Sequence, residues 1–314
     1  MTATREGQTF EHRGSRVLAY VNFVKLPHTL FALPFALVGV VLASYRAPVT
    51  WTVLGWVVLA FSAARFAAMG FNRIADRDID ARNPRTKGRE LPAGVLRLTE
   101  AVVAVTVAAL LFLFAAWRLN WLCATLSPIA LAWVLFYSYT KRFTRWSHIV
   151  LGIGLSIAPA GGYLAVTGTW SRPWWMLVLL SLAVATWSAG FDVLYALQDV
   201  QFDRAERLHS LPASLGEHTA LAIARVLHLV TIFSLAMVGA AVYGSAPGGA
   251  LYAVGVVLAA GLLLYEHTLV RADDLSRLDA AFFTMNGVIS IVFFACVLLE
   301  RVLHQAVLII SARS

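Results

Sequence analysis

Long apolar runs dominate this chain and limit what it can fold into. Of its 314 residues, 60% are hydrophobic and only 13% are charged, whereas soluble domains carry about 25% charged residues. A helix needs about 20 residues to cross the roughly 30 Å hydrocarbon core of a bilayer. We therefore predict an all-α polytopic membrane protein with nine transmembrane helices, at about 28–45, 50–71, 99–117, 120–138, 149–168, 173–197, 219–243, 249–270 and 280–300.

The basic residues predict how these helices are oriented. With nine spans, 18 of the 25 Lys and Arg residues fall on the side of the N-terminus and five on the opposite side. Loops rich in Lys and Arg stay in the cytoplasm. We expect a multi-pass protein of the cell (inner, cytoplasmic) membrane, surrounded by lipid bilayer, with a cytoplasmic N-terminus. The net charge of +8 does not indicate nucleic acid, because the basic residues are spread between the spans.

Two sets of polar residues on this apolar chain share one spacing. Within each set the residues are four positions apart, and the sets are offset by 123 residues: Asn72, Asp76 and Asp80, and Tyr195, Asp199 and Asp203. Residues at i, i+4 and i+8 of a helix drift by only about 40° per step. Each set is therefore expected to line one helix face, at the end of the helix that is predicted to be cytoplasmic.

The same offset predicts two similar halves within a single integral-membrane domain, residues 1–314. Helices 1–4 would occupy about 17–138, helices 5–8 about 148–270, and a ninth helix about 280–300. In each half the acidic set precedes a polar loop that carries basic residues and then a Leu-Pro-Ala step. Long polar loops in compact proteins are often functional.

Carboxylates gathered in two matching places predict a cation site. Aspartate and asparagine oxygens suit hard cations, Mg²⁺ or Ca²⁺, and Mg²⁺ typically keeps positions open for substrate phosphates. The predicted metal ligands are Asn72, Asp76, Asp80, Asp199 and Asp203. The basic loop residues beside them would attract an anion. An isoprenoid diphosphate fits both features, because its head would meet the metal while its tail lies in the bilayer.

Both motifs resemble those of the UbiA-type intramembrane aromatic prenyltransferases. The similarity covers nearly the whole chain and includes Asp192, the segment 137–142 followed by His148 and Gly152, and the segment 23–34. Two departures concern the diphosphate side: Arg73 stands where many members have an acidic residue, and His209 where others have a lysine. The resemblance implies a UbiA-like bundle with a cytoplasm-facing active site.

The resemblance also implies an activity, the transfer of a polyprenyl group to an aromatic acid in ubiquinone or menaquinone biosynthesis. A 4-hydroxybenzoate-like acid is the leading acceptor. Asp192 and Tyr195 are the expected catalytic residues, with Tyr139 a further aromatic candidate. Lys141 and Arg142 are the first choices for diphosphate contacts and Arg85 and Lys87 the next, while Lys25 and Arg65 are expected to pair with the acceptor carboxylate.

Three alternatives remain open. One is prenylation of 1,4-dihydroxy-6-naphthoate, which segments 25–34 and 282–287 favour. Another is a different acceptor within the same superfamily. The third is a cation-coupled transporter, whose repeats would also place acidic residues on an ion path. The transporter fits less well because the aspartates are predicted at helix ends and not at the membrane midplane.

Overall fold

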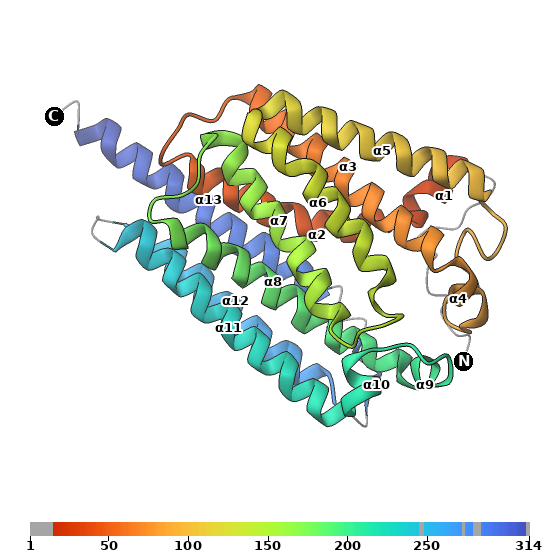
Figure 1. Cartoon of the computed structure of the whole chain (residues 1–314). Coiled ribbons are helices and arrows are strands. Elements are labelled where there is room, and N and C mark those ends of the chain that lie inside the picture. Colours follow the sequence, from red (N-terminus) through yellow and green to blue (C-terminus); the bar gives the residue numbers. More distant parts are fainter. Residues whose placement is uncertain (1–14, 245–247, 272–273, 279–283, 312–314) are drawn as a thin grey trace.

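Figure 1 shows a computed structural model in which long helices run side by side as one bundle and short helices gather at one end. The structure describes residues 15–244, 248–271, 274–278 and 284–311, without the side chains of residues 26–31 and 308–311. The helices are α1 (Arg16–Phe23), α2 (Leu26–Ala43), α3 (Trp51–Ala75), α4 (Arg77–Arg82), α5 (Leu98–Leu119), α6 (Trp121–Thr140), α7 (Ser147–Thr167), α8 (Trp174–Ala196), η1 (Leu197–Asp199), α9 (Val200–Ala205), α10 (Leu211–Leu215), α11 (Glu217–Tyr243), α12 (Ala250–Leu269) and α13 (Asn286–Ser311).

The predicted all-α membrane class is confirmed, although the helix count differs slightly. Eight of the described helices are long and apolar enough to cross a membrane. The predicted span 28–45 corresponds to α2, whose described apolar stretch, Ala32–Ala43, is shorter than the other eight. The predicted ninth span starts at 280, within residues outside the description, and α13 begins at Asn286.

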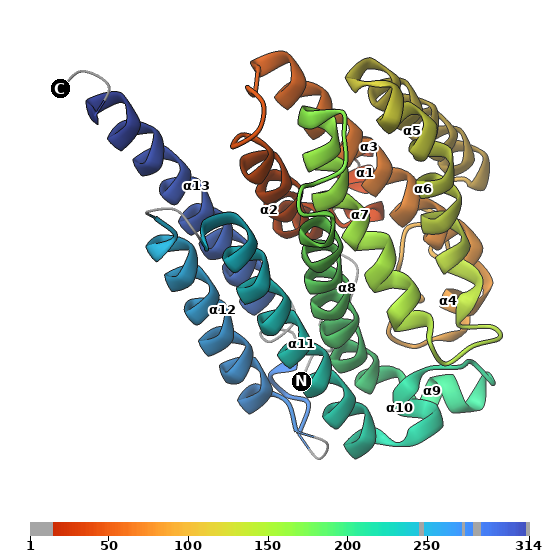
Figure 2. The ribbon, with the colours of Figure 1, turned by 60° about the vertical axis from the view of Figure 1, so that its left-hand side comes forward.

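Five exposed tryptophans lie at one end of the bundle. They stand at the start of α3, α6 and α8, at the end of α5 and just after α7: Trp51, Trp121, Trp174, Trp117 and Trp170. The aspartates of the two motifs lie at the other end, which we call the acidic end, together with α4, α9 and α10 (Figure 2). Tryptophan side chains favour the membrane–water interface. The tryptophans therefore place the end opposite the acidic end at a membrane surface.

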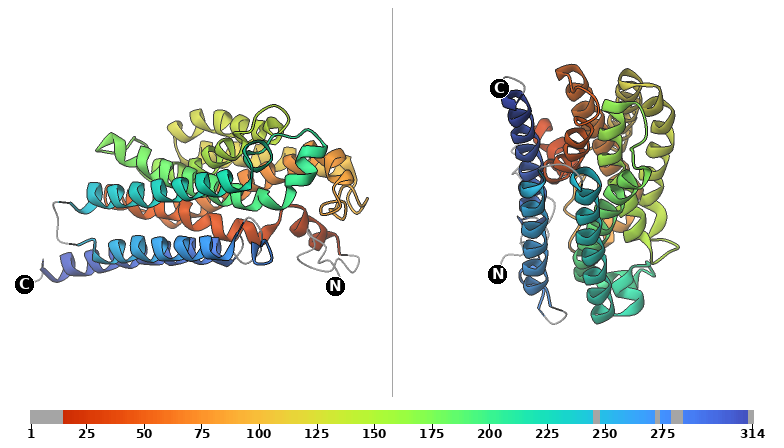
Figure 3. Two further views of the ribbon diagram at one scale, coloured as in Figure 1. Left: turned by 90° about the horizontal axis from the view of Figure 1, so that it is seen from below. Right: turned by 90° about the vertical axis from the view of Figure 1, so that its left-hand side faces the viewer.

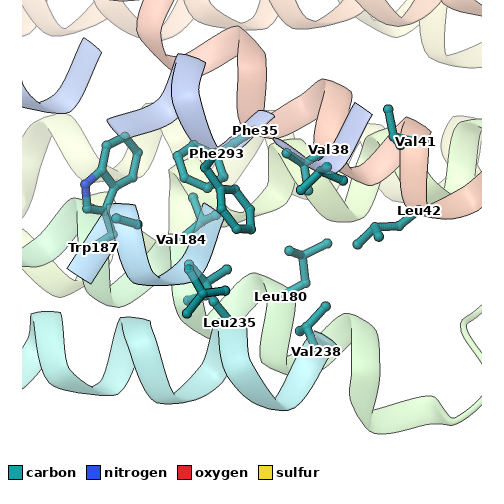
Figure 4. Packing of buried hydrophobic residues seen from close by; sticks show 14 of the residues in the cluster. Phe35, Val38, Val41, Leu42, Leu180, Val184, Trp187, Leu235, Val238 and Phe293 are labelled. Carbon is teal, nitrogen blue, oxygen red and sulfur yellow. The ribbon is translucent and has the colours of Figure 1, made fainter. Parts of the chain in front are cut away.

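Aromatic packing joins helices that are far apart in the sequence (Figure 4). The Phe35 ring on α2 lies 4.7 Å from the Trp187 ring on α8 and 6.0 Å from the Phe293 ring on α13, measured between centroids. All three side chains are buried. Figure 3 shows α12 and α13 on one side of the bundle and α5 and α6 on the other. This core therefore holds α13 against the centre of the molecule.

Small residues let α2 and α7 approach closely. A Cβ atom on Gly39 would lie 2.0 Å from the carbonyl oxygen of Pro159, and one on Gly162 would lie 2.2 Å from that of Ala36. Helices within membranes gain stability mainly from such close contacts, since lipid is as apolar as their side chains. The contact fixes α7 beside α2, so the N-terminus of α7 is held at the acidic end.

Both acidic motifs interrupt their helices at the matching residue, which the prediction of continuous helix faces missed. Asp76 lies between α3 and α4 with φ −97° and ψ 5°. Asp199, its equivalent, precedes α9 with φ −101° and ψ 2°. These angles lie outside the α-helical region, in the sparsely populated area near φ −90° and ψ 0°. The expected 40° drift assumes one straight helix, whereas in each motif a new short helix begins directly after the second residue, Asp76 or Asp199.

Candidate active site

A polar cavity of about 190 Å³ opens at the acidic end. It lies between the ends of α3 and α6, the breaks after α3 and α8, and the loop that follows α4. Every site residue predicted from the sequence lines it, with the exceptions of Lys87 and Tyr139: Lys25, Arg65, Asn72, Asp76, Asp80, Arg85, Lys141, Arg142, Asp192, Tyr195, Asp199 and Asp203. Residues more than 100 positions apart are thus brought into one site.

Arginine residues hold the aspartates of both motifs. Arg89 donates two hydrogen bonds to Asp80, at 2.7 and 2.9 Å from its Nη1 atom to the two carboxylate oxygens. Arg85 forms a close ion pair with Asp199, in which its Nε donates over 3.0 Å. Both pairs are largely buried, so each charge compensates a partner that is shielded from water.

The pair between Arg85 and Asp199 also connects the two halves of the chain. Arg85 belongs to the loop after the first motif, whereas Asp199 belongs to the second motif. Asn83, from the same loop, donates to Asp199 over 3.2 Å. The guanidinium of Arg85 also lies 5.5 Å from the centre of the Tyr195 ring. The loop after the first motif therefore supplies a cationic group, Arg85, to the second motif.

Lys141 lies just beyond the end of α6, half-buried, and interacts electrostatically with four carboxylates. Its burial alone would lower its pKa, but Asp203, Asp192, Asp199 and Asp76 together raise the pKa above its ordinary value. The ammonium group therefore stays charged in the cavity. Negative charge from both motifs and from Asp192 converges on this one cation.

The negative charge of Asp76 is paired less closely with positive groups than the charges of Asp80 and Asp199. Burial raises the pKa of Asp76, the nearby charge of Asp80 raises it further, and Lys141 and Arg142 only partly oppose this. Arg142 approaches Asp76 no closer than 3.5 Å. The carboxylate therefore remains short of positive charge in the structure.

The donor set fits a hard divalent cation. It consists of carboxylate and amide oxygens, which Mg²⁺ prefers, and Asp203 has a buried Oδ2 atom without a hydrogen-bond partner. Among the described residues, no three acidic, His or Cys side chains are grouped closely enough to hold an ion. Arg85 and Arg89 occupy two of the carboxylates in this conformation. An ion that bound Asp80 or Asp199 would have to displace these arginines.

Sequence reasoning missed three residues with clear roles in the geometry. Arg89 binds Asp80, Asn83 binds Asp199, and Tyr137 lines the cavity. The basic character of the loop signalled Arg89, but a sequence does not show which of several loop cations turns inward. Tyr139, predicted as a participant, does not line the cavity and is exposed, because residues two positions apart on α6 point about 200° apart.

The sequence associates three other residues with the diphosphate side, and the structure places only one of them in the cavity. Lys87 is exposed and outside the cavity. Arg73 is buried and lines the cavity, with its Nε donating to the carbonyl oxygen of Phe23 over 3.4 Å. His209 is exposed, and its backbone N–H donates to the carbonyl oxygen of Lys141 over 2.7 Å.

An apolar chamber of about 500 Å³ continues from the polar cavity into the bundle. It lies among α2, α3, α5, α6, α7 and α8 and reaches Leu119 and Trp170 near the opposite end. The two spaces share the residues at their junction: Arg65, Met69, Asn72, Tyr137, Leu151 and Leu155. A ligand with a charged head and a long apolar tail matches this arrangement.

Comparison with known proteins decides the family. The sequence pattern of the UbiA prenyltransferase family matches residues 32–288. The chain belongs to the UbiA prenyltransferase family. The resemblance predicted from the two motifs is therefore confirmed, and the chain is a prenyltransferase.

Relatives within the UbiA family are similar to this protein over most of the chain. The 4-hydroxybenzoate octaprenyltransferase of Aeromonas salmonicida is 32% identical over 286 residues, which cover 90% of this chain and 96% of that protein. The protein of the same name from Herminiimonas arsenicoxydans is 30% identical over 249 residues, covering 79% and 84%.

Solved structures of the UbiA family share the fold. The apo structure of a UbiA homologue from Aeropyrum pernix has a TM-score of 0.78 and 33% identity, covering 87% of this chain and 98% of that one. A UbiA homologue from Archaeoglobus fulgidus, bound to GPP and Mg²⁺, has a TM-score of 0.68 and 18% identity, covering 90% and 99%.

Proposed function

We propose that this UbiA-family prenyltransferase transfers a polyprenyl group from an isoprenoid diphosphate to an aromatic acid resembling 4-hydroxybenzoate, with Mg²⁺ as cofactor, in quinone biosynthesis. The observation that carries the proposal is the continuity of the polar cavity with the apolar chamber. The names of the octaprenyltransferase relatives support the acceptor and a long prenyl donor. The homologue bound to GPP and Mg²⁺ supports the cofactor.

The diphosphate would bind in the polar cavity, between the two motifs. Asn72, Asp76, Asp80, Asp199 and Asp203 are the proposed Mg²⁺ ligands. Bound Mg²⁺ would supply positive charge that stabilises the leaving diphosphate. Once Arg85 and Arg89 give up their carboxylates, their guanidinium groups can donate to phosphate oxygens, an interaction that their fork of N–H donors suits.

Lys141 and Arg142 complete the cationic side of the proposed diphosphate site. Both line the cavity, and aspartates of both motifs raise the pKa of Lys141, which keeps its ammonium group charged. As the allylic C–O bond breaks, its electron pair leaves on the diphosphate, where positive groups that are already in place stabilise the charge. Lys87 is exposed, and its contribution would be limited to the general positive potential of the loop.

The aromatic acid would bind on the other side of the cleaved bond. Arg65 lies at the junction of the polar cavity and the apolar chamber, with a buried Nε atom that has no hydrogen-bond partner. Arg65, with Lys25 nearby in the cavity, is the proposed partner of the acceptor carboxylate. The Tyr195 ring, with the Lys25 Nζ 5.9 Å from its centre, offers a face to the allylic carbocation.

The reaction then requires a base. A ring carbon of the acceptor bonds to the allylic carbon, and the ring C–H proton must leave to restore aromaticity. Asp192 lines the cavity and is the proposed acceptor of that proton. We place the reaction at the cytoplasmic face of the inner membrane, with the N-terminus inside, because the basic residues gather on that side.

The direct test uses purified protein in lipid nanodiscs with Mg²⁺ and a labelled polyprenyl diphosphate. 4-Hydroxybenzoate and 1,4-dihydroxy-6-naphthoate are supplied in separate reactions, each with and without EDTA. Prenylated 4-hydroxybenzoate that disappears with EDTA is the expected result. Product from the naphthoate alone would show that the naphthoate, and not 4-hydroxybenzoate, is the acceptor. Turnover in EDTA would contradict the assignment of Mg²⁺ as cofactor. No product from any aromatic acid would refute the proposal.

A further inference from the structure

A histidine outside the predicted site contacts the proposed base. His148 lies in the first turn of α7 and is fully buried. Its Nδ1 atom is 2.6 Å from Oδ2 of Asp192 on α8. The side chain of Asp192 is 16% exposed and lines the polar cavity. His148 itself does not line the cavity, so it reaches the reaction only through Asp192.

The second nitrogen of His148 fixes the direction of this hydrogen bond. The backbone N–H of Leu211, at the start of α10, donates to Nε2 of His148 over 3.4 Å. A backbone N–H can only donate, so Nε2 must carry a lone pair. In the neutral ring the proton is then on Nδ1, which donates to the carboxylate of Asp192. The contacts thus select one tautomer and one ring orientation.

The environment of Asp192 gives this hydrogen bond a function. We propose that His148 is a positioning residue that holds Asp192 with one carboxylate oxygen bound and the other turned toward the aromatic acceptor. Oδ2 accepts from His148, which leaves Oδ1 to take the ring proton. An error of about 1 Å in the placement of a reacting group can cost on the order of 100-fold in rate. A partly buried hydrogen bond of 2.6 Å restricts such movement.

His148 also links the base to the diphosphate side. Leu211 follows the loop after the second motif, and the backbone N–H of His209 in that loop donates to the carbonyl oxygen of Lys141. The chain from Asp192 through His148 to Leu211 therefore ends in the segment that also contacts Lys141. The geometry of the base depends on this loop as well as on α8.

The inference rests on the proposed function, and three variants test it in the same assay. His148→Leu removes both hydrogen bonds. His148→Asn keeps an N–H donor near the position of Nδ1. His228→Leu is the matched control, because His228 is also buried and bonds His267 over 3.0 Å on α11 and α12. His228 packs against Gly190 on the face of α8 opposite to Asp192.

We expect His148→Leu to lower kcat by about 100-fold, with KM for the prenyl diphosphate unchanged. His148→Asn should recover most of the loss, and His228→Leu should stay within about twofold of the wild type in kcat. An acceptor deuterated at the reacting ring carbon should show a larger isotope effect in His148→Leu than in the wild type, because proton removal becomes slower.

The outcomes separate the two proposals. A wild type that is active while His148→Leu keeps its kcat would overturn the role of His148 and leave the proposed function intact. So would equal losses in His148→Leu and His148→Asn with no change in the isotope effect, because packing alone would then explain them. A wild type inactive with every aromatic acid would overturn both.

Discussion

In the metal-free protein, the ion pair between Arg89 and Asp80 compensates part of the negative charge of the acidic site. Both side chains are buried, with 13% and 8% of their surface exposed. Removing one partner of a buried pair costs about 3–5 kcal/mol, since the other charge is left uncompensated. In Arg89→Leu this charge is Asp80, which already lies close to Asp76. Arg82→Leu is the control, because its pair with Glu206 is 53% and 27% exposed and is worth about 0–1 kcal/mol.

Thermal unfolding in EDTA and in excess Mg²⁺ measures how much stability each variant loses relative to the wild type. At about 2 °C per kcal/mol, Arg89→Leu should melt roughly 6–10 °C below the wild type in EDTA, and Arg82→Leu within about 2 °C. Adding Mg²⁺ should narrow the gap for Arg89→Leu, because Asp80 regains a positive partner. Equal melting of both variants in EDTA, or a gap that Mg²⁺ leaves unchanged, would refute the idea that arginine and metal share these carboxylates.

Four further predictions concern single residues. Asp76→Asn and Asp199→Asn should each lower kcat at least about 100-fold while the protein stays folded by circular dichroism; activity retained in both contradicts the metal assignment. Because the pKa of Asp76 is raised, its contribution to stability is complete below the ordinary pKa and is lost as pH rises through the raised value. Melting in EDTA should therefore fall across that window in the wild type but not in Asp76→Asn, and equal slopes would contradict this. Gly161→Leu should lower activity with long prenyl donors more than activity with geranyl diphosphate, because Gly161 lines the chamber and a side chain there has open space. Gly55→Leu is the control: its position is equally open but lies outside the chamber, so it should not discriminate between the donors. Equal effects of Gly161→Leu on both donors would contradict the proposal that the chamber holds the prenyl tail. Arg65→Gln should raise KM for the aromatic acid but not for the prenyl diphosphate. The reverse pattern would indicate that Arg65 binds the diphosphate and not the acceptor carboxylate.

The sequence predicted the membrane class and most of the cavity because both depend on local patterns. Apolar runs set the helices, and repeated spacing brought the aspartates to matching helix ends. The breaks at Asp76 and Asp199 were not predictable from spacing, since helical periodicity assumes that the helix continues. The inward turn of Arg89 and the outward turn of Lys87 depend on how the loop folds over the second motif. The sequence indicates His148 only through a family resemblance, because its partner Asp192 lies 44 positions away.

The central claim is that carboxylates from both halves of the chain hold Mg²⁺ around a diphosphate. A structure of the protein with Mg²⁺ and a non-cleavable prenyl diphosphate analogue tests it most directly. We predict metal density about 2.1 Å from oxygens of the first motif and of the second, with Arg85 and Arg89 turned toward the phosphates. Metal bound to one motif alone, or a diphosphate bound without metal, would contradict the claim.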